Sequence, residues 1–207
     1  MGSSHRYNYY WIRVSSNWPS AHGSKEYIMT ANIYPLNVIG ITGWSGSGKT
    51  SLIIRLIPEL RARGMRVATL KHAHHSFDLD TEGKDSYRHR AAGASEVVVS
   101  SRKRWAIMHE NSTDDEPSLD ILLARMSPAD IILVEGFKGE GHAKIEVHRP
   151  SKGAEFICGK NENIVAIASD EPLPAAMLPV LDLNDTKAVA DFIMDRCAPA
   201  LTAARTN

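Results

Sequence analysis

The feature that most constrains this chain is a glycine-rich loop between an apolar run and an apolar helical pattern. Residues 43–50 (GWSGSGKT) match G-x-x-x-x-G-K-[ST], the loop that wraps the phosphates of a bound nucleotide. A β-rich run at 38–42 precedes the loop, and the pattern after it predicts a helix over 49–63 that Gly64 ends. Strand, loop and helix in this order predict a phosphate-binding unit at the edge of an α/β sheet.

The residue types of the loop suit a bound phosphate. Glycine at 43, 46 and 48 lets backbone N–H groups approach phosphate oxygens closely, and the helix dipole adds a positive end. Lys49 is placed to reach the β- and γ-phosphates, and the Thr50 hydroxyl is placed to coordinate Mg²⁺. The predicted nucleotide-binding residues here are Gly43, Trp44, Ser45, Gly46, Ser47, Gly48, Lys49, Thr50 and Ser51.

Composition is that of one α/β domain. With 207 residues and 43% hydrophobic content the chain can bury a sizeable core, and its 24 basic and 24 acidic residues cancel. This balance argues against general nucleic-acid binding. Cys158 and Cys197 lie far apart in the sequence and lack the spacing of metal-binding cysteines. This suits reduced thiols in a cytosolic protein. No apolar run approaches the roughly 18 residues of a membrane span. We therefore expect a soluble, cytoplasmic protein without membrane contact.

Residues 1–28 are expected to lie outside the folded domain. The chain opens like an expression tag, and the aromatic stretch at 7–11 shows no periodicity before Met29, an alternative start. We interpret 1–28 as a leader or tag segment without fixed structure. The open alternative is an interaction arm that uses its aromatic rings. Residues 29–207 are then predicted to form a single nucleotide-binding domain.

Strand and helix patterns alternate along the rest of the chain. Pro58 is expected to kink the first helix. Repeated alternation predicts an α/β fold of the P-loop NTPase class, with a mostly parallel, doubly wound sheet and helices on both faces. The expected strands are 38–42, 66–71, 96–101, 104–110, 131–135, 144–149 and 164–168, and the expected helices are 49–63, 84–92, 117–126 and 186–197.

A carboxylate ends the apolar strand at 131–135. Ligands of such sheets bind outside the carboxyl ends of the strands, which places Glu135 near the phosphates. The predicted metal residues are Thr50 and Glu135, the latter acting on Mg²⁺ through a coordinated water. The alternative is a carboxylate that caps the strand end or forms a salt bridge.

The segment after the second strand carries several ionisable side chains. In this P-loop class the position often holds a loop that responds to the γ-phosphate, so Asp78 or Asp80 is a candidate to orient water or to bind the outer shell of the metal. The histidines at 72, 74 and 75 leave anion contact, substrate recognition, zinc binding and a structural role open.

The strand expected at 164–168 leads to Asp170. A carboxylate there is able to accept the N1 and N2 hydrogens of guanine, so we count Asp170 among the nucleotide-binding residues. The usual N-K-x-D guanine signature is absent, and a turn or cap role for Asp170 is the alternative.

An ordered set of short motifs resembles one family. Besides 43–50, the set contains 71–75 (KHAHH), 83–87 (GKDSY), 104–106 (RWA), 133–138 (LVEGFK), 144–145 (KI) and 168–170 (ASD). Over about residues 36–197 it resembles the molybdopterin-guanine dinucleotide biosynthesis protein B family, MobB. The resemblance implies a GTP-binding, weakly hydrolysing homodimer. Such a protein assists the guanylyltransferase MobA in converting the molybdopterin cofactor to its guanine dinucleotide form.

The resemblance also implies site roles. It assigns phosphate binding to 43–50 and a metal-side role to Thr50 and Glu135, and it implies a functional surface for the pterin cofactor or the partner enzyme. A pterin phosphate favours cations, and its ring favours an aromatic face such as Trp105. The candidate cofactor or switch residues are Lys71, His72, His74, His75, Asp78, Asp80, Arg104 and Lys138.

Other function classes stay open from the sequence alone. An adaptor would bind GTP and a partner with negligible turnover, as a slow GTPase at most, because neither a general base nor an arginine finger can be placed. The stretches 104–110 and 144–149 exceed the needs of a central sheet and are expected to pair in a homodimer. A small-molecule kinase would instead clamp phosphates with Arg88, Arg90, Arg102 or Arg104.

Overall fold

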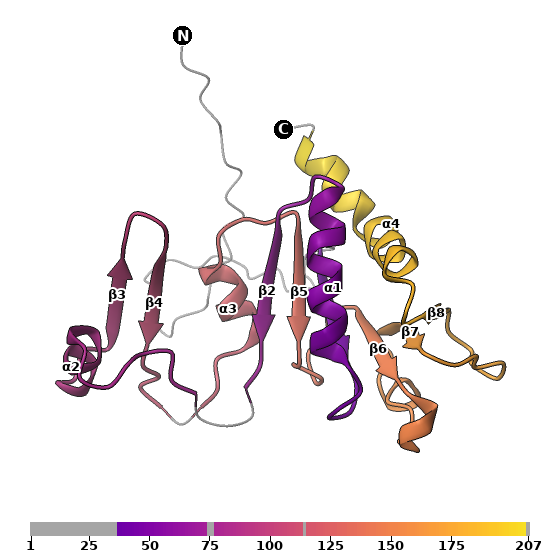
Figure 1. Cartoon of the computed structure of the whole chain (residues 1–207), viewed down its shortest axis with the longest axis horizontal. Helices are drawn as coiled ribbons and strands as arrows, with labels where there is room; N and C mark the ends of the chain where they lie inside the picture. The colour runs from indigo at the N-terminus through magenta and orange to yellow at the C-terminus, as the bar shows by residue number, and fades with distance from the viewer. Residues whose placement is uncertain (1–36, 74–76, 114, 206–207) are drawn as a thin grey trace, which may run out of the picture.

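The computed structural model describes residues 37–73, 77–113 and 115–205 (Figure 1). The expected leader at 1–28 and the candidates His74 and His75 lie outside these ranges, and the single domain over 29–207 stays a prediction. In the described part, no helix is long and apolar enough to cross a membrane. The cytoplasmic location also stays a prediction.

The described residues form a six-stranded sheet and a separate two-stranded sheet. The larger sheet is parallel throughout, in the order β2-β5-β1-β6-β7-β8, and the smaller pairs β3 with β4 antiparallel. The strands are β1 (Val38–Thr42), β2 (Val67–Lys71), β3 (Glu96–Ser100), β4 (Trp105–His109), β5 (Ile131–Glu135), β6 (Lys144–His148), β7 (Ile164–Ser169) and β8 (Val180–Asp182). The helices are α1 (Lys49–Ala62), α2 (Asp85–Ala91), α3 (Leu119–Arg125) and α4 (Thr186–Arg205).

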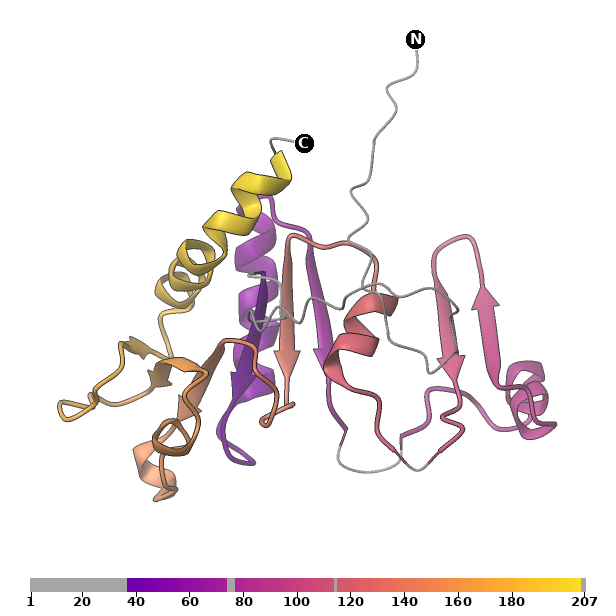
Figure 2. The same cartoon turned by 180° about the vertical axis from the view of Figure 1, so that it is seen from behind.

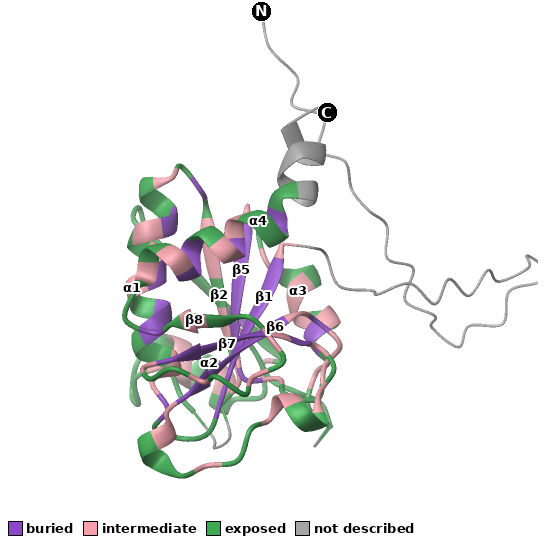
Figure 3. Cartoon of the chain, turned by 90° about the vertical axis from the view of Figure 1, so that its right-hand side faces the viewer, coloured by how far each residue is buried: buried purple, intermediate pink, exposed green. Residues whose placement is uncertain are grey.

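Helices cover both faces of the parallel sheet, which confirms the predicted doubly wound class (Figures 1 and 2). On one face, Leu52, Leu56 and Leu60 of α1 pack with α4 and the odd residues of β1 into the larger core cluster. On the other face, Leu119 of α3 packs with Val38 and Val134. Figure 3 shows the buried central strands between these layers. Strands of a parallel sheet that are buried on both faces usually form near-continuous apolar runs, and β1 and β5 could be predicted because they do.

Several predicted bounds differ from the structure. The last helix continues to Arg205 rather than ending at 197, and β8 was not predicted because it is a short edge strand of three residues. Helix α1 continues through Pro58 to Ala62. The kink at Pro58 stays a prediction.

The prediction that 144–149 is surplus to the central sheet is wrong. Strand β6 lies between β1 and β7, and all five of its residues are buried. Its odd residues, Ile145 and Val147, enter the core beneath α1 and α4. Its even residues are Lys144, Glu146 and His148. Because these residue types are polar, the sequence pattern predicted an exposed strand instead of a central one.

The segment 136–143 crosses the sheet between β5 and β6 without a helix. It lies on Gly40, where a Cβ would come within 2.6 Å of the His142 ring, so the central strand β1 needs glycine there. The buried Lys144 ammonium holds this segment by donating to the backbone oxygens of Glu140 and His142, the latter at 2.9 Å. Hydrogen bonds from a buried cation thus hold this helix-free segment on the sheet.

Burial lowers the pKa of Lys144 to about 8 from its ordinary 10.5, although the Glu140 carboxylate raises it. Between these values the unfolded chain binds more protons than the folded chain, so the stability contributed by this position rises with pH. We expect the free energy of unfolding of the native chain, minus that of a Lys144→Met variant, to rise by about 2 kcal/mol between pH 8 and pH 10. Urea denaturation at both pH values measures this difference, and a constant difference would contradict the expectation.

The segment 150–162 covers the rest of the polar face of β6. It contains the 3-10 turns Pro150–Lys152 and Cys158–Lys160. The buried Glu146 carboxylate accepts the backbone N–H groups of Ile157 and Cys158, each at 2.8 Å. His148 stacks on Phe156 with the ring centroids 4.1 Å apart. Side chains of β6 therefore hold this irregular segment directly on the sheet.

The β3–β4 hairpin and α2 form a unit beside the main sheet, at the left of Figure 1. Val97 of β3 is buried on the side where α2 packs. The opposite face exposes Val98, Trp105 and Ile107, which keep 58%, 61% and 48% of their residue surface accessible. Val98 and Ile107 stand directly across the hairpin from each other. The hairpin therefore presents an apolar face that the described chain leaves uncovered.

Candidate functional site

The glycine-rich loop joins β1 to α1 in the conformation its glycines allow. Gly43 and Gly48 have φ values of 142° and 105°, a region that other residues avoid. A Cβ on Gly43 would also lie 2.5 Å from the backbone oxygen of Val147 in β6. Gly48 is the N-cap of α1. The loop therefore closes tightly against the sheet edge and opens its backbone N–H groups at a helix start, where anions bind.

Lys49 lies folded over this loop. Its Nζ donates to the backbone oxygens of Gly43 at 3.0 Å and Trp44 at 2.9 Å. Burial lowers the pKa of Lys49, Glu135 raises it, and the nearby cations Lys138 and Lys71 lower it further. A crowded, partly desolvated cation of this kind gains more from a phosphate than an exposed lysine would.

The two predicted metal residues touch each other. Thr50 Oγ1 donates to Glu135 Oε1 at 2.8 Å, and Lys71 Nζ lies 3.7 Å from the same oxygen. These side chains come from the start of α1 and from the ends of β5 and β2, which are neighbours in the sheet. The structure thus brings the ends of β5 and β2 together with the start of α1 at one edge of the sheet. The hollow at this edge is lined by Ser45, Gly46, Gly48, Lys49, Thr50, Ser51 and Glu135.

The donor set fits Mg²⁺. That ion takes few protein oxygens and keeps several waters, and one hydroxyl beside one carboxylate at a phosphate-binding loop supplies such a set. Within the described ranges, no group of three or more His, Cys, Asp or Glu side chains could hold a metal ion. His74 and His75 lie outside those ranges, so the zinc alternative is not tested.

His72 lies beside the end of β5. Its backbone N–H donates to the oxygen of Glu135 at 2.8 Å, and its ring pairs with Glu116. The ring centroid lies 4.9 Å from that of Phe137. A Cβ on Gly136 would lie 2.6 Å from the Cβ of His72. His72 is thus packed against the strand that carries Glu135, and its imidazole is engaged with a carboxylate.

Asp78 and Asp80 are not brought to the phosphate-binding loop. Asp78 pairs with Arg90 at 2.6 Å, and Asp80 accepts a hydrogen bond from Ser86 at 2.8 Å. Arg90 also pairs with Glu110 at 3.2 Å, and Asp78, Arg90 and Glu110 border a hollow of their own. The backbone N–H of Asp80 and then Arg90 lower the pKa of Asp78. In the structure these carboxylates join the loop after β2 to α2, and Arg90 of α2 pairs in turn with Glu110, the residue after β4.

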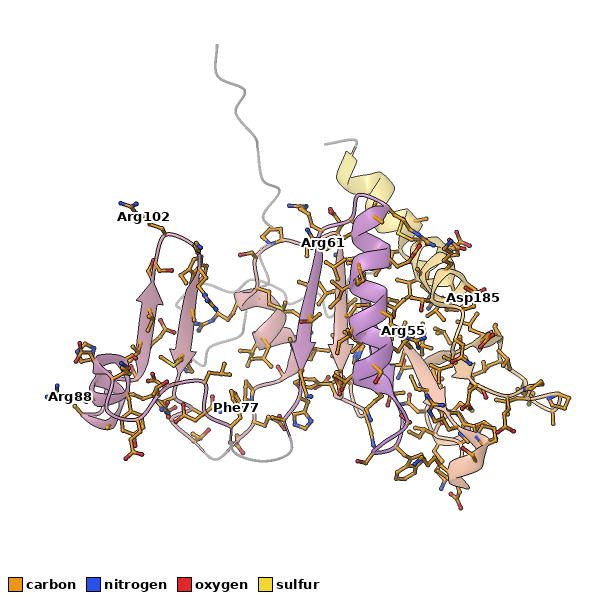
Figure 4. The ribbon with its side chains drawn as sticks, in the orientation of Figure 1. Arg55, Arg61, Phe77, Arg88, Arg102 and Asp185 are labelled. Atoms are coloured by element: carbon orange, nitrogen blue, oxygen red, sulfur yellow. The ribbon has the colours of Figure 1, made fainter. Side chains whose placement is uncertain are left out.

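The four arginines proposed for a kinase clamp all belong to the hairpin unit. Arg90 is occupied by carboxylates, and Arg88 lies 3.7 Å from Asp85. Arg102 and Arg104 lie in the turn between β3 and β4. Figure 4 shows Arg88 and Arg102 on the far side of the molecule from α1. The structure therefore brings no member of this set, Arg104 included, to the hollow at Lys49.

Lys138 reaches the loop through Trp44. Its Nζ lies 5.1 Å from the centroid of the half-exposed Trp44 ring, a cation–π distance. The Trp44 indole N–H donates to the backbone oxygen of Glu155 at 2.7 Å. The segments before and after β6 therefore both contact the second residue of the loop.

Asp170 reaches the loop through an arginine that the sequence reading missed. Arg149 follows β6, pairs with Asp170, and donates from Nε to the backbone oxygen of Ser47 at 2.9 Å. The missed signal was a basic residue directly after a strand, because the ends of parallel strands share one edge. It was overlooked because β6 was not placed in the central sheet.

Comparison with known proteins agrees with this geometry. The family model for molybdopterin guanine dinucleotide synthesis protein B, MobB, matches residues 38–170. The chain is 44% identical over 163 residues to the molybdopterin-guanine dinucleotide biosynthesis adapter protein of Escherichia coli, covering 76% of this chain and 91% of that one. It is also 44% identical over 168 residues to the Haemophilus influenzae adapter protein, covering 80% and 91%.

Solved structures place the fold in the same group. A crystal structure of molybdopterin-guanine biosynthesis protein B superposes with a TM-score of 0.61 at 29% identity, over 78% of this chain and 99% of that one. A MobB homolog from Bacillus stearothermophilus superposes with a TM-score of 0.57 at 24% identity, over 79% and 99%. The predicted P-loop NTPase fold is confirmed. With a family model that matches residues 38–170 and two relatives at 44% identity, the chain belongs to the MobB family.

Proposed function

We propose that this chain binds GTP and Mg²⁺ at the start of α1 and acts as an adapter in molybdopterin guanine dinucleotide biosynthesis, assisting the guanylyltransferase MobA. The observation that carries nucleotide binding is the convergence of Lys49, Thr50 and Glu135 at one sheet edge. The adapter role is supported by the relatives, which carry that name. Guanine recognition is the part that rests on family resemblance.

We expect slow hydrolysis because of where the arginines lie. A finger at the γ-phosphate accelerates hydrolysis by roughly 10³–10⁵-fold. Arg149 is engaged with Ser47 and Asp170, and Arg88, Arg90, Arg102 and Arg104 lie in the hairpin unit. We expect GTP turnover by the isolated protein far below about 1 s⁻¹, the low end of kinase rates.

The pterin cofactor is proposed to bind beside the same loop. Lys71 and Lys138 add positive charge next to Lys49, and Trp44 supplies a half-exposed aromatic ring. Cations suit the pterin phosphate, and an aromatic face suits the ring. His72 and Arg104 are less favoured for this role, because His72 is packed against Phe137 and Arg104 lies in the hairpin turn.

Reconstitution of a molybdoenzyme from defined components tests the proposed function. The apoenzyme is activated with MobA, molybdopterin cofactor and GTP, with native protein, with the Lys49→Ala variant or with no addition. We expect more active enzyme with native protein only. Equal activation in all three reactions would refute the assisting role, and rapid phosphorylation of a small acceptor would favour the kinase.

Glu135 is expected to act on Mg²⁺. Replacing Glu135 with glutamine keeps the shape of the side chain and removes the charge beside Thr50, so the gain in GTP affinity on adding Mg²⁺ should fall by about tenfold. Titration of GTP with and without Mg²⁺ measures the gain. The exposed Glu162→Gln variant is the control. An unaltered Mg²⁺ titration would reduce Glu135 to a strand-end carboxylate that binds Thr50.

The hairpin is proposed to form a homodimer contact. The apolar face of Val98, Trp105 and Ile107, together with the free edges of a two-stranded sheet, suits pairing with a second copy. We expect sedimentation at micromolar concentration to show a species of twice the 22.8 kDa chain mass. An Ile107→Lys variant should shift it to the monomer. A native protein that sediments only as a monomer would contradict the dimer.

A further inference from the structure

We propose that Arg149 is a positioning residue of the nucleotide site, which holds the phosphate-binding loop against the sheet edge, and that Asp170 acts on the site through Arg149. The proposal rests on the proposed nucleotide binding and names a residue that supports it from outside the motif. It also changes the role of Asp170, which would act on the phosphates of any nucleotide rather than on the base.

One guanidinium joins three parts of the site. Arg149 donates from Nε to the backbone oxygen of Ser47 at 2.9 Å and pairs through NH1 with Asp170. Its NH2 lies 3.4 Å from the position that a Cβ on Gly48 would occupy, beside the N-cap of α1. The planar fork of an arginine can serve several acceptors in fixed directions, which a lysine cannot do.

The loop needs support of this kind. Gly43, Gly46 and Gly48 all have positive φ, and glycine loses more conformational freedom on ordering than any other residue. Ser47 contributes one hydrogen bond inside the loop, from its N–H to the oxygen of Trp44 at 3.2 Å. Arg149 is a donor to a loop carbonyl, so it steadies the loop without using the N–H groups that phosphate oxygens would accept.

Asp170 is placed to hold Arg149. The side chains of Arg149 and Asp170 are only 32% and 19% exposed to solvent. Their charges are therefore partly desolvated, and their ion pair is stronger than one at an open surface. Asp170 Oδ2 contacts Arg149, while Oδ1 is buried and has no hydrogen-bond partner within the described part of the chain. Neither oxygen is open to an approaching base in this arrangement.

The two roles of Asp170 predict different nucleotide preferences. A carboxylate that accepts N1 and N2 hydrogens of guanine prefers GTP over xanthosine triphosphate, and an asparagine in its place reverses that preference, since the amide can donate to the xanthine oxygen. A carboxylate that acts through Arg149 alters phosphate binding only. Its replacement should then weaken both nucleotides by the same factor.

Calorimetric titration of GTP and xanthosine triphosphate against single and double variants tests the proposal. We expect Arg149→Gln and Asp170→Asn each to weaken both nucleotides by about tenfold, the loss of one charge-assisted hydrogen bond. The double variant should be no weaker than either single variant, because the two residues act as one unit. Arg149→Lys keeps the charge but not the fork, and should fall between native and Arg149→Gln.

Arg55→Gln is the matched control. Arg55 also donates to a backbone oxygen, that of Leu183 at 2.8 Å, but from the middle of α1 (Figure 4). This variant should bind both nucleotides as the native chain does. Melting curves identify variants that fail to fold, and if Arg149→Gln fails, Arg149→Lys and Asp170→Asn still decide the result.

Each contrary result refutes a distinct claim. Native affinity in Arg149→Gln, or a preference for xanthosine triphosphate in Asp170→Asn, would overturn this inference and leave nucleotide binding intact. A native chain without affinity for GTP would instead refute the proposed function.

Discussion

A Lys49→Ala variant is expected to lose nucleotide binding, by about 100-fold or more in affinity, with an unchanged fold. Lys49 Nζ lies over the loop and donates to its first two carbonyls, beside the hollow in which we propose that the phosphates bind. Each charge-assisted hydrogen bond contributes about 1.5–3 kcal/mol, and a phosphate chain forms more than one with this lysine. The side chain is not part of the apolar core, so removing it leaves no cavity there.

Titration of GTP into native protein and variant, alongside melting curves, checks this result. Lys103→Ala is the matched control, because Lys103 is an exposed lysine in the turn of the β3–β4 hairpin. It should bind GTP as the native chain does. Near-native affinity in Lys49→Ala, with an unchanged melting curve, would contradict the assignment of 43–50 as a phosphate-binding loop.

The largest effect on stability is expected at Glu146. The buried carboxylate accepts the N–H groups of Ile157 and Cys158, both at 2.8 Å, and no helix covers this part of the sheet. Removing it in Glu146→Ala leaves two part-buried N–H donors without this acceptor. Each unsatisfied donor costs about 1–3 kcal/mol, so the free energy of unfolding should fall by about 3 kcal/mol or more.

Urea denaturation measures this loss, and Glu155→Ala is the control. The Glu155 side chain is 78% exposed and pairs with Lys160 at 3.1 Å, in the same covering segment. Its removal should change stability by less than about 0.5 kcal/mol, as at other surface positions. Equal stability losses in the two variants would show that the bonds of Glu146 do not hold the segment.

Much of the nucleotide site could be predicted because its signals are local. The loop at 43–50 and the strand 131–135 can each be recognised from a few consecutive residues. Because the ends of parallel strands share one edge of the sheet, Glu135 could also be expected near Thr50. Lys138 was predicted from resemblance, and the structure places it over Trp44. Asp78 and Asp80 follow the end of β2 by seven residues or more. At that separation the position of the strand end no longer constrains a side chain, and both carboxylates lie beside Arg90 instead.

The placement of β6 in the central sheet could not be predicted from its own residues. A strand that reads Lys-Ile-Glu-Val-His has the alternation of a half-exposed edge strand. Its polar residues are nevertheless buried, because backbone groups of segments 136–143 and 150–162 satisfy Lys144 and Glu146, and the Phe156 ring stacks on His148. Those partners are 2 to 12 residues away in sequence and follow no period. The same error hid Arg149. The other stretch expected to be surplus, 104–110, does lie outside the central sheet, in the two-stranded sheet.

The sequence by itself determined the phosphate-binding loop, the apolar strands β1 and β5, and the doubly wound class, because glycine conformation, helix capping and hydrophobic periodicity act over short stretches of chain. Only the tertiary structure decided that β6 is a central strand, that β3 and β4 form a sheet of their own, and that Arg149 links Asp170 to Ser47. The physical reason is that a charged side chain is buried only where partners satisfy it, and the partners of β6 and Arg149 are positioned by the fold as a whole and not by a periodic sequence pattern.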